Sequence, residues 1–199
     1  MISKFFECEV NRNEKYYRVI QTEKDYPDGK KFPIDEIVVA NRKVNLNAIE
    51  PNEMGGFCIS KYSYIFRWLI RGDTLCEVEI PNDTKIYKTT SKNGIYIADK
   101  IILKNPIKID DDYAMELYKI STLPEKSYFI AMTVCAICGY MKTVFKVLED
   151  KVTKENVDIA IYELENFCKR REEEFKVDCS KNPEVVLLKN KLKDIKAAK

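Results

Sequence analysis

The stretch that decides the fold is "LCEVEIPNDTKIYK", Leu75–Lys88, in which a strand, a Pro-Asn-Asp turn and a second strand follow one another. Alternate residues of a strand point to opposite faces, so Glu77 and Glu79 share one face. The other face carries Cys76, Val78 and Ile80. This alternation predicts a strand with one buried face. The acidic face is open to two interpretations, a solvated surface or the wall of a site that uses carboxylates.

Similar patterns extend from this hairpin in both directions along the chain. Runs rich in β-branched and aromatic residues predict strands at 15–22, 35–47, 52–60, 74–80, 85–89 and 94–103. An apolar stripe over 61–73, with Gly72 near its end, predicts a helix that covers the sheet. After 104–112 the pattern becomes helical, with helices predicted at 111–121, 123–141, 141–152, 153–175 and 182–199. Thr153 is the predicted N-cap of the fourth of these.

These elements predict an α+β fold made of two parts. Residues 1–108 are expected to form a β-rich domain, and residues 109–199 a helical region.

The composition restricts the chemistry available to this chain. Its 199 residues include no histidine, which excludes Ser-His-Asp and Cys-His catalysis within the chain as well as histidine-ligated metals. A net charge of +2 gives no strong attraction to nucleic acid or anionic lipid, so we expect neither as a partner. No apolar run is long enough to cross a membrane, and acidic residues near the N-terminus predict no export. The seven cysteines are therefore expected to be reduced thiols in a cytosol.

One resemblance rests on several short motifs in a fixed order. Gly56-Phe57, an aromatic-rich segment ending in Gly72-Asp73, "EVEIP" and "ADKIIL" follow one another between residues 15 and 110. This part of the chain resembles a domain found in many uncharacterised proteins of giant DNA viruses of amoebae, where it often precedes ankyrin repeats. The resemblance implies a viral protein that acts in the host cytoplasm, and it implies no particular activity.

The helical region carries a weaker likeness of its own. The segment "SYFIAMTVCAICGYMKTVFKVLED", residues 127–150, resembles the two helices of one degenerate ankyrin repeat, with Gly139-Tyr140 at the turn. A single repeat cannot bury both of its faces, and arrays need about three or more. We therefore expect a helical hairpin packed on the first domain and not a repeat solenoid. Any amphipathic helix pair with a glycine between its helices would give the same pattern.

A more distant resemblance concerns enzymatic function. "GGFCIS" and "LCEVEIPNDTKIYK" are similar to the central strands of ADP-ribosyltransferases of the Arg-Ser-Glu type. The resemblance implies that Arg18 holds NAD, that Ser60 braces the site, and that Glu77 stabilises the oxocarbenium-like ribose as nicotinamide leaves. Glu79 is its companion or replacement. The chain departs from that family at Leu75, where a second Glu or Gln is usual, and at "CIS" in place of Ser-Thr-Ser.

Two further groups of residues have alternative interpretations. The aromatic cluster that begins at Tyr62 is expected to be either the core face of a helix or a surface on which an adenine stacks, with Tyr62 as the cofactor-binding residue. Cys135 and Cys138 form a CxxC inside an apolar helix, which indicates buried core thiols.

Two functions remain open from the sequence. The first is a viral protein-binding module without catalysis or cofactor, whose partner is a host or viral protein and whose expected contact surface is the helical half. The second is a NAD-dependent ADP-ribosyltransferase.

Overall fold

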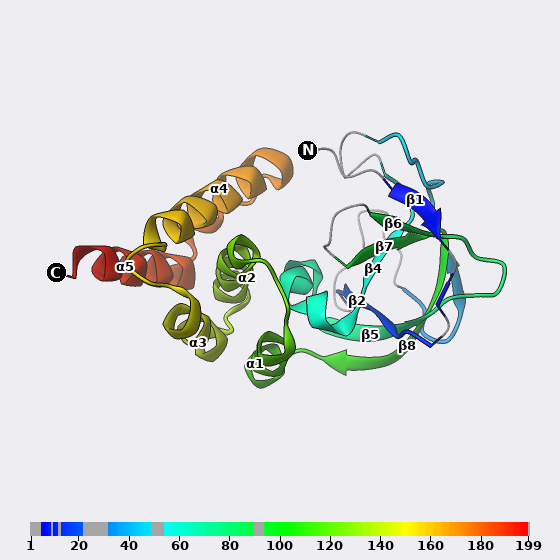
Figure 1. The fold of residues 1–199 in the computed structure, drawn as a ribbon, viewed down its shortest axis with the longest axis horizontal. Coiled ribbons are helices and arrows are strands. Elements are labelled where there is room, and N and C mark those ends of the chain that lie inside the picture. Colours follow the sequence, from blue (N-terminus) through cyan, green and yellow to red (C-terminus); the bar gives the residue numbers. More distant parts are fainter. Residues whose placement is uncertain are drawn as a thin grey trace. The chain divides into compact units, whose positions relative to one another are not determined.

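The computed structural model describes residues 5–8, 10–11, 13–21, 32–48, 54–89 and 94–198. Within these ranges the N-terminal half forms an antiparallel sheet and the C-terminal half forms helices, which confirms the predicted α+β fold (Figure 1). The chain divides into two compact units, Met1–Ile65 with Arg71–Lys108, and Phe66–Ile70 with Ile109–Lys199. A boundary after residue 108 was predicted from the sequence, whereas the assignment of Phe66–Ile70 to the second unit was not.

The sheet of the first unit has strands in the order β1-β6-β7-β4-β2-β5-β8-β3, each antiparallel to its neighbours. Their bounds are Phe5–Cys8 (β1), Tyr16–Ile20 (β2), Ile37–Val39 (β3), Phe57–Ser60 (β4), Thr74–Glu79 (β5), Ile86–Thr89 (β6), Ile95–Ala98 (β7) and Lys100–Lys108 (β8). Strands β1 and β3 are the two edges of this sheet.

One face of the sheet encloses the core of the first unit. Cys8 of β1 and Val38 of β3 pack against the same buried cluster, although they come from opposite edges of the sheet. The cluster has residues from every strand between these two edges, and the sheet curls around it (Figure 1). The apolar face of the opening stretch, Cys76, Val78 and Ile80, belongs to it, as the alternation predicts.

Strand β8 differs from its prediction. The sequence predicts one strand over 94–103, whereas β7 ends at Ala98 and β8 continues to Lys108. Its pairing with β5 shifts between Leu75↔Ile107 and Glu77↔Lys104, so that two residues of β8 face one residue of β5. The bulge contains Asn105, at φ 49°, and Pro106, whose missing N–H a bulge tolerates. The strand therefore continues beyond Pro106, although the sequence pattern predicts that it ends before this proline.

The predicted covering helix is a 3₁₀-helix, η2, Tyr62–Arg71. It ends at Gly72, where the chain passes very close to β2. A Cβ at this position would lie 2.0 Å from the backbone oxygen of Ile20, so no residue but glycine fits without a shift of the backbone.

The second unit is a group of helices around a central one. Their bounds are Asp111–Ile120 (α1), Glu125–Cys138 (α2), Met141–Lys151 (α3), Val157–Phe175 (α4), Cys179–Lys181 (η3) and Pro183–Ala197 (α5). Helix α2 packs against α3, α4 and α5, and most of its residues from Tyr128 to Ala136 are buried. Helices α2 and α3 form the predicted hairpin, with Gly139 in the left-handed conformation at φ 80° between them.

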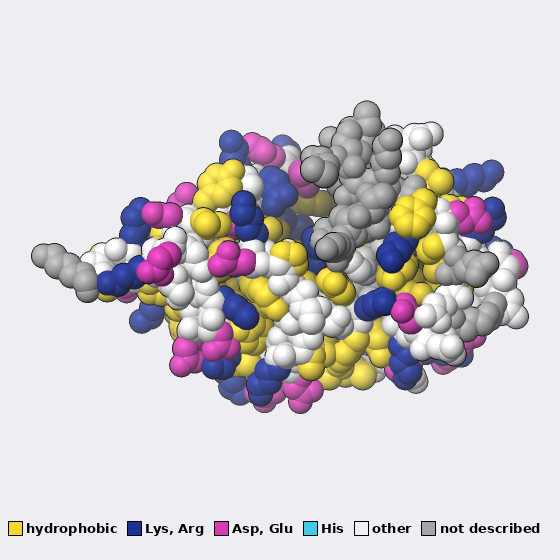
Figure 2. All heavy atoms as spheres, in the orientation of Figure 1, with side chains coloured by type: hydrophobic (Ala, Val, Ile, Leu, Met, Phe, Trp, Pro, Cys, Tyr) yellow, Lys and Arg dark blue, Asp and Glu magenta, His cyan; other side chains and the backbone are white. Residues whose placement is uncertain are grey.

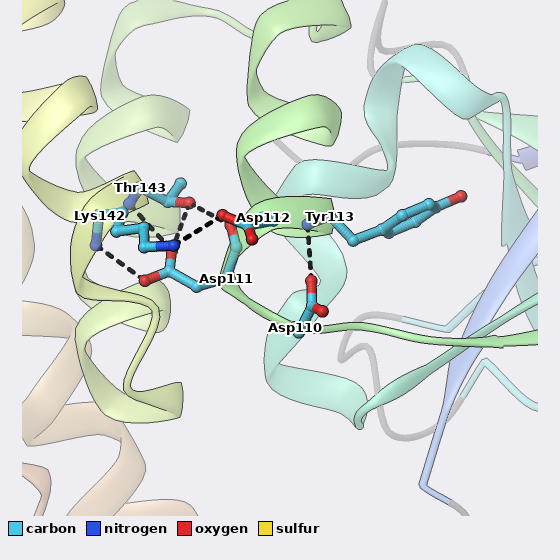
Figure 3. A network of polar contacts seen from close by, with 6 residues as sticks. All are labelled: Asp110, Asp111, Asp112, Tyr113, Lys142 and Thr143. Carbon is cyan, nitrogen blue, oxygen red and sulfur yellow. Dashed lines mark hydrogen bonds and ion pairs between the residues drawn. The ribbon is translucent and has the colours of Figure 1, made fainter.

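The N-terminus of α3 is capped by a residue of another helix. Tyr140 at its own N-cap makes no side-chain cap, and the carboxylate of Asp111 takes that role. It accepts hydrogen bonds from the backbone N–H of Lys142 (2.8 Å), the backbone N–H of Thr143 (3.0 Å) and the Thr143 hydroxyl (2.8 Å) (Figure 3). Asp110 caps α1 itself by accepting from the Tyr113 N–H. The starts of α1 and α3 are thereby joined.

The predicted cap of α4 is wrong. The sequence placed its N-cap at Thr153, but α4 begins at Val157 with Asn156 at the N-cap. The side-chain Oδ1 of Asn156 accepts from the Thr153 N–H (2.8 Å), and its Nδ2 donates to the Lys151 backbone oxygen (2.9 Å) and to the Glu125 carboxylate (2.8 Å). Because Asn156 fixes residues 153–156 as a turn, the helix starts after them.

Candidate functional site

The acidic face of β5 carries ion pairs. Glu77 accepts hydrogen bonds from Lys15 (3.0 Å) and from the Asn105 amide (3.0 Å). These bonds, with Lys15 the larger cause, hold the pKa of Glu77 below its usual value. Glu79, whose side chain is 58% exposed, lies 3.7 Å from Lys104. Both carboxylates are therefore partnered by lysines, and the β8 bulge supplies the amide that orients Glu77.

A cleft of about 460 Å³ opens beside these two glutamates. It is lined by Val10, Asn11, Glu14, Lys15, Tyr16, Glu77, Val78, Glu79, Ile80, Lys104 and Asn105. Both acidic and basic residues line it, and Arg18, Ser60 and Tyr62 do not. The cleft thus contains the candidate glutamates without the residues that the transferase resemblance assigns to NAD.

The pairing of β2 with β5 decides the relation between Arg18 and Glu77. Arg18 lies opposite Cys76, and Tyr17 lies opposite Glu77. Residues directly opposite in a ladder share a face, and neighbours along a strand do not. Arg18 therefore points to the core face with Cys76, whereas Glu77 points to the outer face. The structure places these two candidate residues on opposite faces of the sheet.

Arg18 lies inside the curled sheet, where its side chain is 7% exposed. Its Nη1 donates to the Cys58 backbone oxygen (2.7 Å), and its guanidinium carbon lies 5.5 Å from the ring centres of Phe32 and Phe57. Burial raises the pKa of neighbouring Cys76 to about 11, against the opposing effect of the Arg18 charge. These contacts describe a buried arginine that the core surrounds on several sides.

Ser60 and Tyr62 lie on the same side of the sheet as Glu77. Tyr17 of β2 is opposite Ser60 of β4 on one side and Glu77 of β5 on the other. Two strand spacings, roughly 10 Å, therefore separate Ser60 from Glu77, with the Tyr17 side chain between them. Ser60 is buried and its hydroxyl donates to the Lys61 oxygen (3.0 Å), while the Tyr62 ring packs on Tyr17 at 4.8 Å between centres. The ring of Tyr62 thus packs against another aromatic side chain of its own unit.

Strand β3, to which no sequence motif assigns a role, is an edge strand with exposed apolar side chains. Ile37 and Val39 are each 58% exposed and share one face, while Val38 between them packs on the core. The other edge strand, β1, exposes one apolar side chain, Phe6 (48%), next to Glu7, which is exposed and forms an ion pair with Lys85. Exposed apolar residues on an edge strand are the feature that sheets usually avoid.

The backbone of β3 adds to this feature. Ala40 donates its N–H to the Asp99 oxygen (2.8 Å), which continues the ladder Ile37↔Ile102, Val38↔Ile101, Val39↔Lys100. Hydrogen-bonded and non-bonded pairs alternate in an antiparallel ladder, so Val38 bonds to β8 and its two neighbours point away from it. In the ranges described above, we find no hydrogen bond to the outward N–H and C=O groups of Ile37 and Val39. The edge therefore offers free donors and acceptors beside apolar side chains.

A sequence signal for this site exists but is weak. Three β-branched residues, "IVV", lie between Asp35-Glu36 and Arg42-Lys43. That pattern predicts a short strand, but whether the strand lies at an edge depends on pairings with distant segments.

In the CxxC of the second unit, Cys135 is buried, as the sequence indicates, whereas Cys138 is half-buried. Cys135 is 0% exposed, and burial raises the pKa of its thiol well above the usual value. Burial also raises the pKa of Cys138 to about 11, and its Sγ donates to the Leu69 oxygen. Both thiols lie within helix α2, near its C-terminal end, and stay protonated at neutral pH.

The surface charges, the helices and the comparisons with known proteins point to no particular function. Figure 2 shows lysine and arginine side chains interspersed with acidic ones on the face that it presents. None of the helices in the described part of the chain has the length and apolar character needed to span a membrane. Comparison with models of known families, with curated proteins and with solved structures finds no match to this chain.

Proposed function

We propose that this chain is a protein-binding module without catalysis, and that it binds an extended segment of a partner by adding that segment to the edge of β3. The added segment would form main-chain hydrogen bonds to Ile37 and Val39. Its own apolar side chains would cover theirs.

The observation that supports this proposal is the coincidence of two properties at Ile37 and Val39. Their side chains are each 58% exposed, and their N–H and C=O groups point away from β8. Main-chain bonds give strand addition its affinity, and the exposed side chains give it selectivity. Ile102 of β8, opposite Ile37, extends the apolar surface inward from the edge.

The geometry favours binding over the transferase alternative. Transfer of ADP-ribose by the implied residues needs the arginine and the glutamate to face one bound dinucleotide. The β2–β5 pairing sends Arg18 to the core face and Glu77 to the outer face, where Lys15 and Asn105 hold its carboxylate. Incubation with labelled NAD tests this directly. We expect no nicotinamide release from the wild-type protein or from Glu77→Gln.

The sequence resemblance implies a host or viral protein in the host cytoplasm as the partner, and we propose such a partner for the edge of β3.

The test is co-purification from an amoebal extract with the full chain as bait. The informative variant is Ile37→Lys/Val39→Lys, because two charges at the edge oppose an apolar strand and leave the core face of β3 unchanged. A matched control is Tyr162→Lys, which introduces a lysine at a side chain that is 63% exposed on α4.

We expect the wild type and Tyr162→Lys to enrich the same proteins from the extract to an equal extent. The double variant should not enrich these proteins. If the double variant enriches the same proteins as the wild type, or if no extract protein is enriched and the chain does not associate with itself, the proposed role of β3 is wrong.

A further inference from the structure

We propose that the strand added to β3 is the β3 of a second copy of this chain, running antiparallel to the first. This inference rests on the proposed function, because it names the partner of the same edge. It makes the chain a symmetric dimer in which two sheets join through β3.

The pattern of free backbone groups suits such a pairing. With a two-fold axis beside Val38, Ile37 of one copy lies opposite Val39 of the other. These are the residues whose N–H and C=O groups point outward. Each such pair exchanges both of its hydrogen bonds, as alternate pairs of an antiparallel ladder do. In this register the exposed side chains of both copies come together on one face.

The charges on either side of β3 favour the antiparallel direction and a second copy. Asp35 and Glu36 precede the strand, and Arg42 and Lys43 follow it, all four being exposed. Asp35 also lies 3.1 Å from Lys104 of its own copy. The two-fold axis beside Val38 places the acidic flank of each copy beside the basic flank of the other. A parallel pairing would bring like charges together. The chain is thus complementary to itself at this edge.

The size of the edge sets the expected strength. Three strand residues with short flanks make an interface below the standard size of stable complexes, so association depends strongly on concentration. Since part of the attraction comes from exposed charges, it also weakens with added salt.

The test is sedimentation equilibrium of the full chain over a series of concentrations up to about 1 mM, where weak interfaces still associate. Two single variants change one flank each, Glu36→Lys and Lys43→Glu. Each leaves its flank with one acidic and one basic residue, so a flank without net charge meets a charged flank at both ends of the pairing. In an equal mixture of the two, the mixed dimer regains an acidic flank beside a basic one. Folding is checked for every variant by circular dichroism.

We expect a concentration-dependent dimer for the wild type, a shift of at least tenfold toward monomer for each single variant, and recovery in the mixture. Wild-type protein that stays monomeric throughout the series overturns the inference, as does a dimer that both single variants leave unchanged.

The two proposals fail separately. If the wild type is monomeric and an extract protein still binds in a manner that depends on Ile37 and Val39, the second copy is excluded and strand addition stands. If substitution of those two residues changes neither association nor extract binding, both proposals are wrong.

Discussion

Substitution of Asp111, a half-buried residue at the start of α1, by alanine should destabilise the second unit. The substitution removes the acceptor of three hydrogen bonds at the start of α3, two from backbone N–H groups and one from the Thr143 hydroxyl. Loss of an N-cap costs about 1 kcal/mol, and loss of hydrogen bonds to a charged group costs about 1.5–3 kcal/mol. Since these describe overlapping interactions, we expect the free energy of unfolding to fall by about 2 kcal/mol.

The matched control is Asp112→Ala. Asp112 lies in the same turn of α1, so both substitutions remove one negative charge from that helix N-terminus. Its carboxylate pairs only with the exposed side chain of Lys142, with 78% and 69% of the two side chains exposed. Exposed pairs of this kind contribute little, so the stability of this variant should stay close to that of the wild type. The difference between the two variants isolates the cap.

Urea unfolding followed by circular dichroism at 222 nm measures the effect. With a slope of about 2 kcal/mol per molar urea, the expected loss lowers the midpoint of Asp111→Ala by about 1 M. Asp111→Asn should lie between this variant and the wild type, because an amide oxygen retains part of the cap. Equal midpoints for Asp111→Ala and Asp112→Ala would refute the assignment of Asp111 as the cap of α3.

Three further predictions concern the glycines, the buried thiols and the acidic face. Gly72→Ala should lower the free energy of unfolding in urea by about 3 kcal/mol or more, because the added Cβ meets a backbone oxygen. Gly139→Ala should lower it by about 1 kcal/mol, because its Cβ meets no described neighbour within 4 Å and only the left-handed conformation is strained. A Gly72 variant as stable as the Gly139 variant would contradict this. Cys135 should react with iodoacetamide only after denaturation, by mass spectrometry of digests, because it is fully buried; labelling in the native state would contradict that burial. Since the folded pKa of Glu77 is lowered, its contribution is present above the usual carboxyl pKa and is lost as the pH falls through the folded value. Glu77→Gln should therefore be less stable than the wild type at neutral pH and equal to it in strong acid, and a difference that grows on acidification would be inconsistent with the lowered pKa.

The sequence was sufficient for the elements whose signals are local. The alternation of Leu75–Ile80, the stripe of 61–73 and the helical periods after residue 110 each depend on residues that lie close together in the chain. The structure has a strand or helix at each of these places. The start of α4 could not be predicted from local sequence alone, because both Thr153 and Asn156 are residue types that cap helices. The hydrogen bonds of the Asn156 side chain to Thr153, to α2 and to α3 fix the start of the helix after Asn156.

The candidate site depended on register, which the sequence does not contain. Arg18 and Glu77 both alternate correctly within their own strands, but which residues lie opposite one another is set by pairings between distant segments. A register changed by one residue would have brought both side chains to the same face. Likewise, "IVV" predicts a strand, but its place at an edge follows from the order of eight strands.

Hydrogen exchange at single-residue resolution tests the central claim most directly. The amides of Ile37 and Val39 should exchange rapidly in the dilute chain, because they point to the free edge, while the Val38 amide is protected by β8. When the chain is bound to its partner, a second copy or a protein enriched from extract, the account predicts slowed exchange at Ile37 and Val39 and little change at β1. Unchanged exchange at these two amides in the bound state would contradict strand addition at β3.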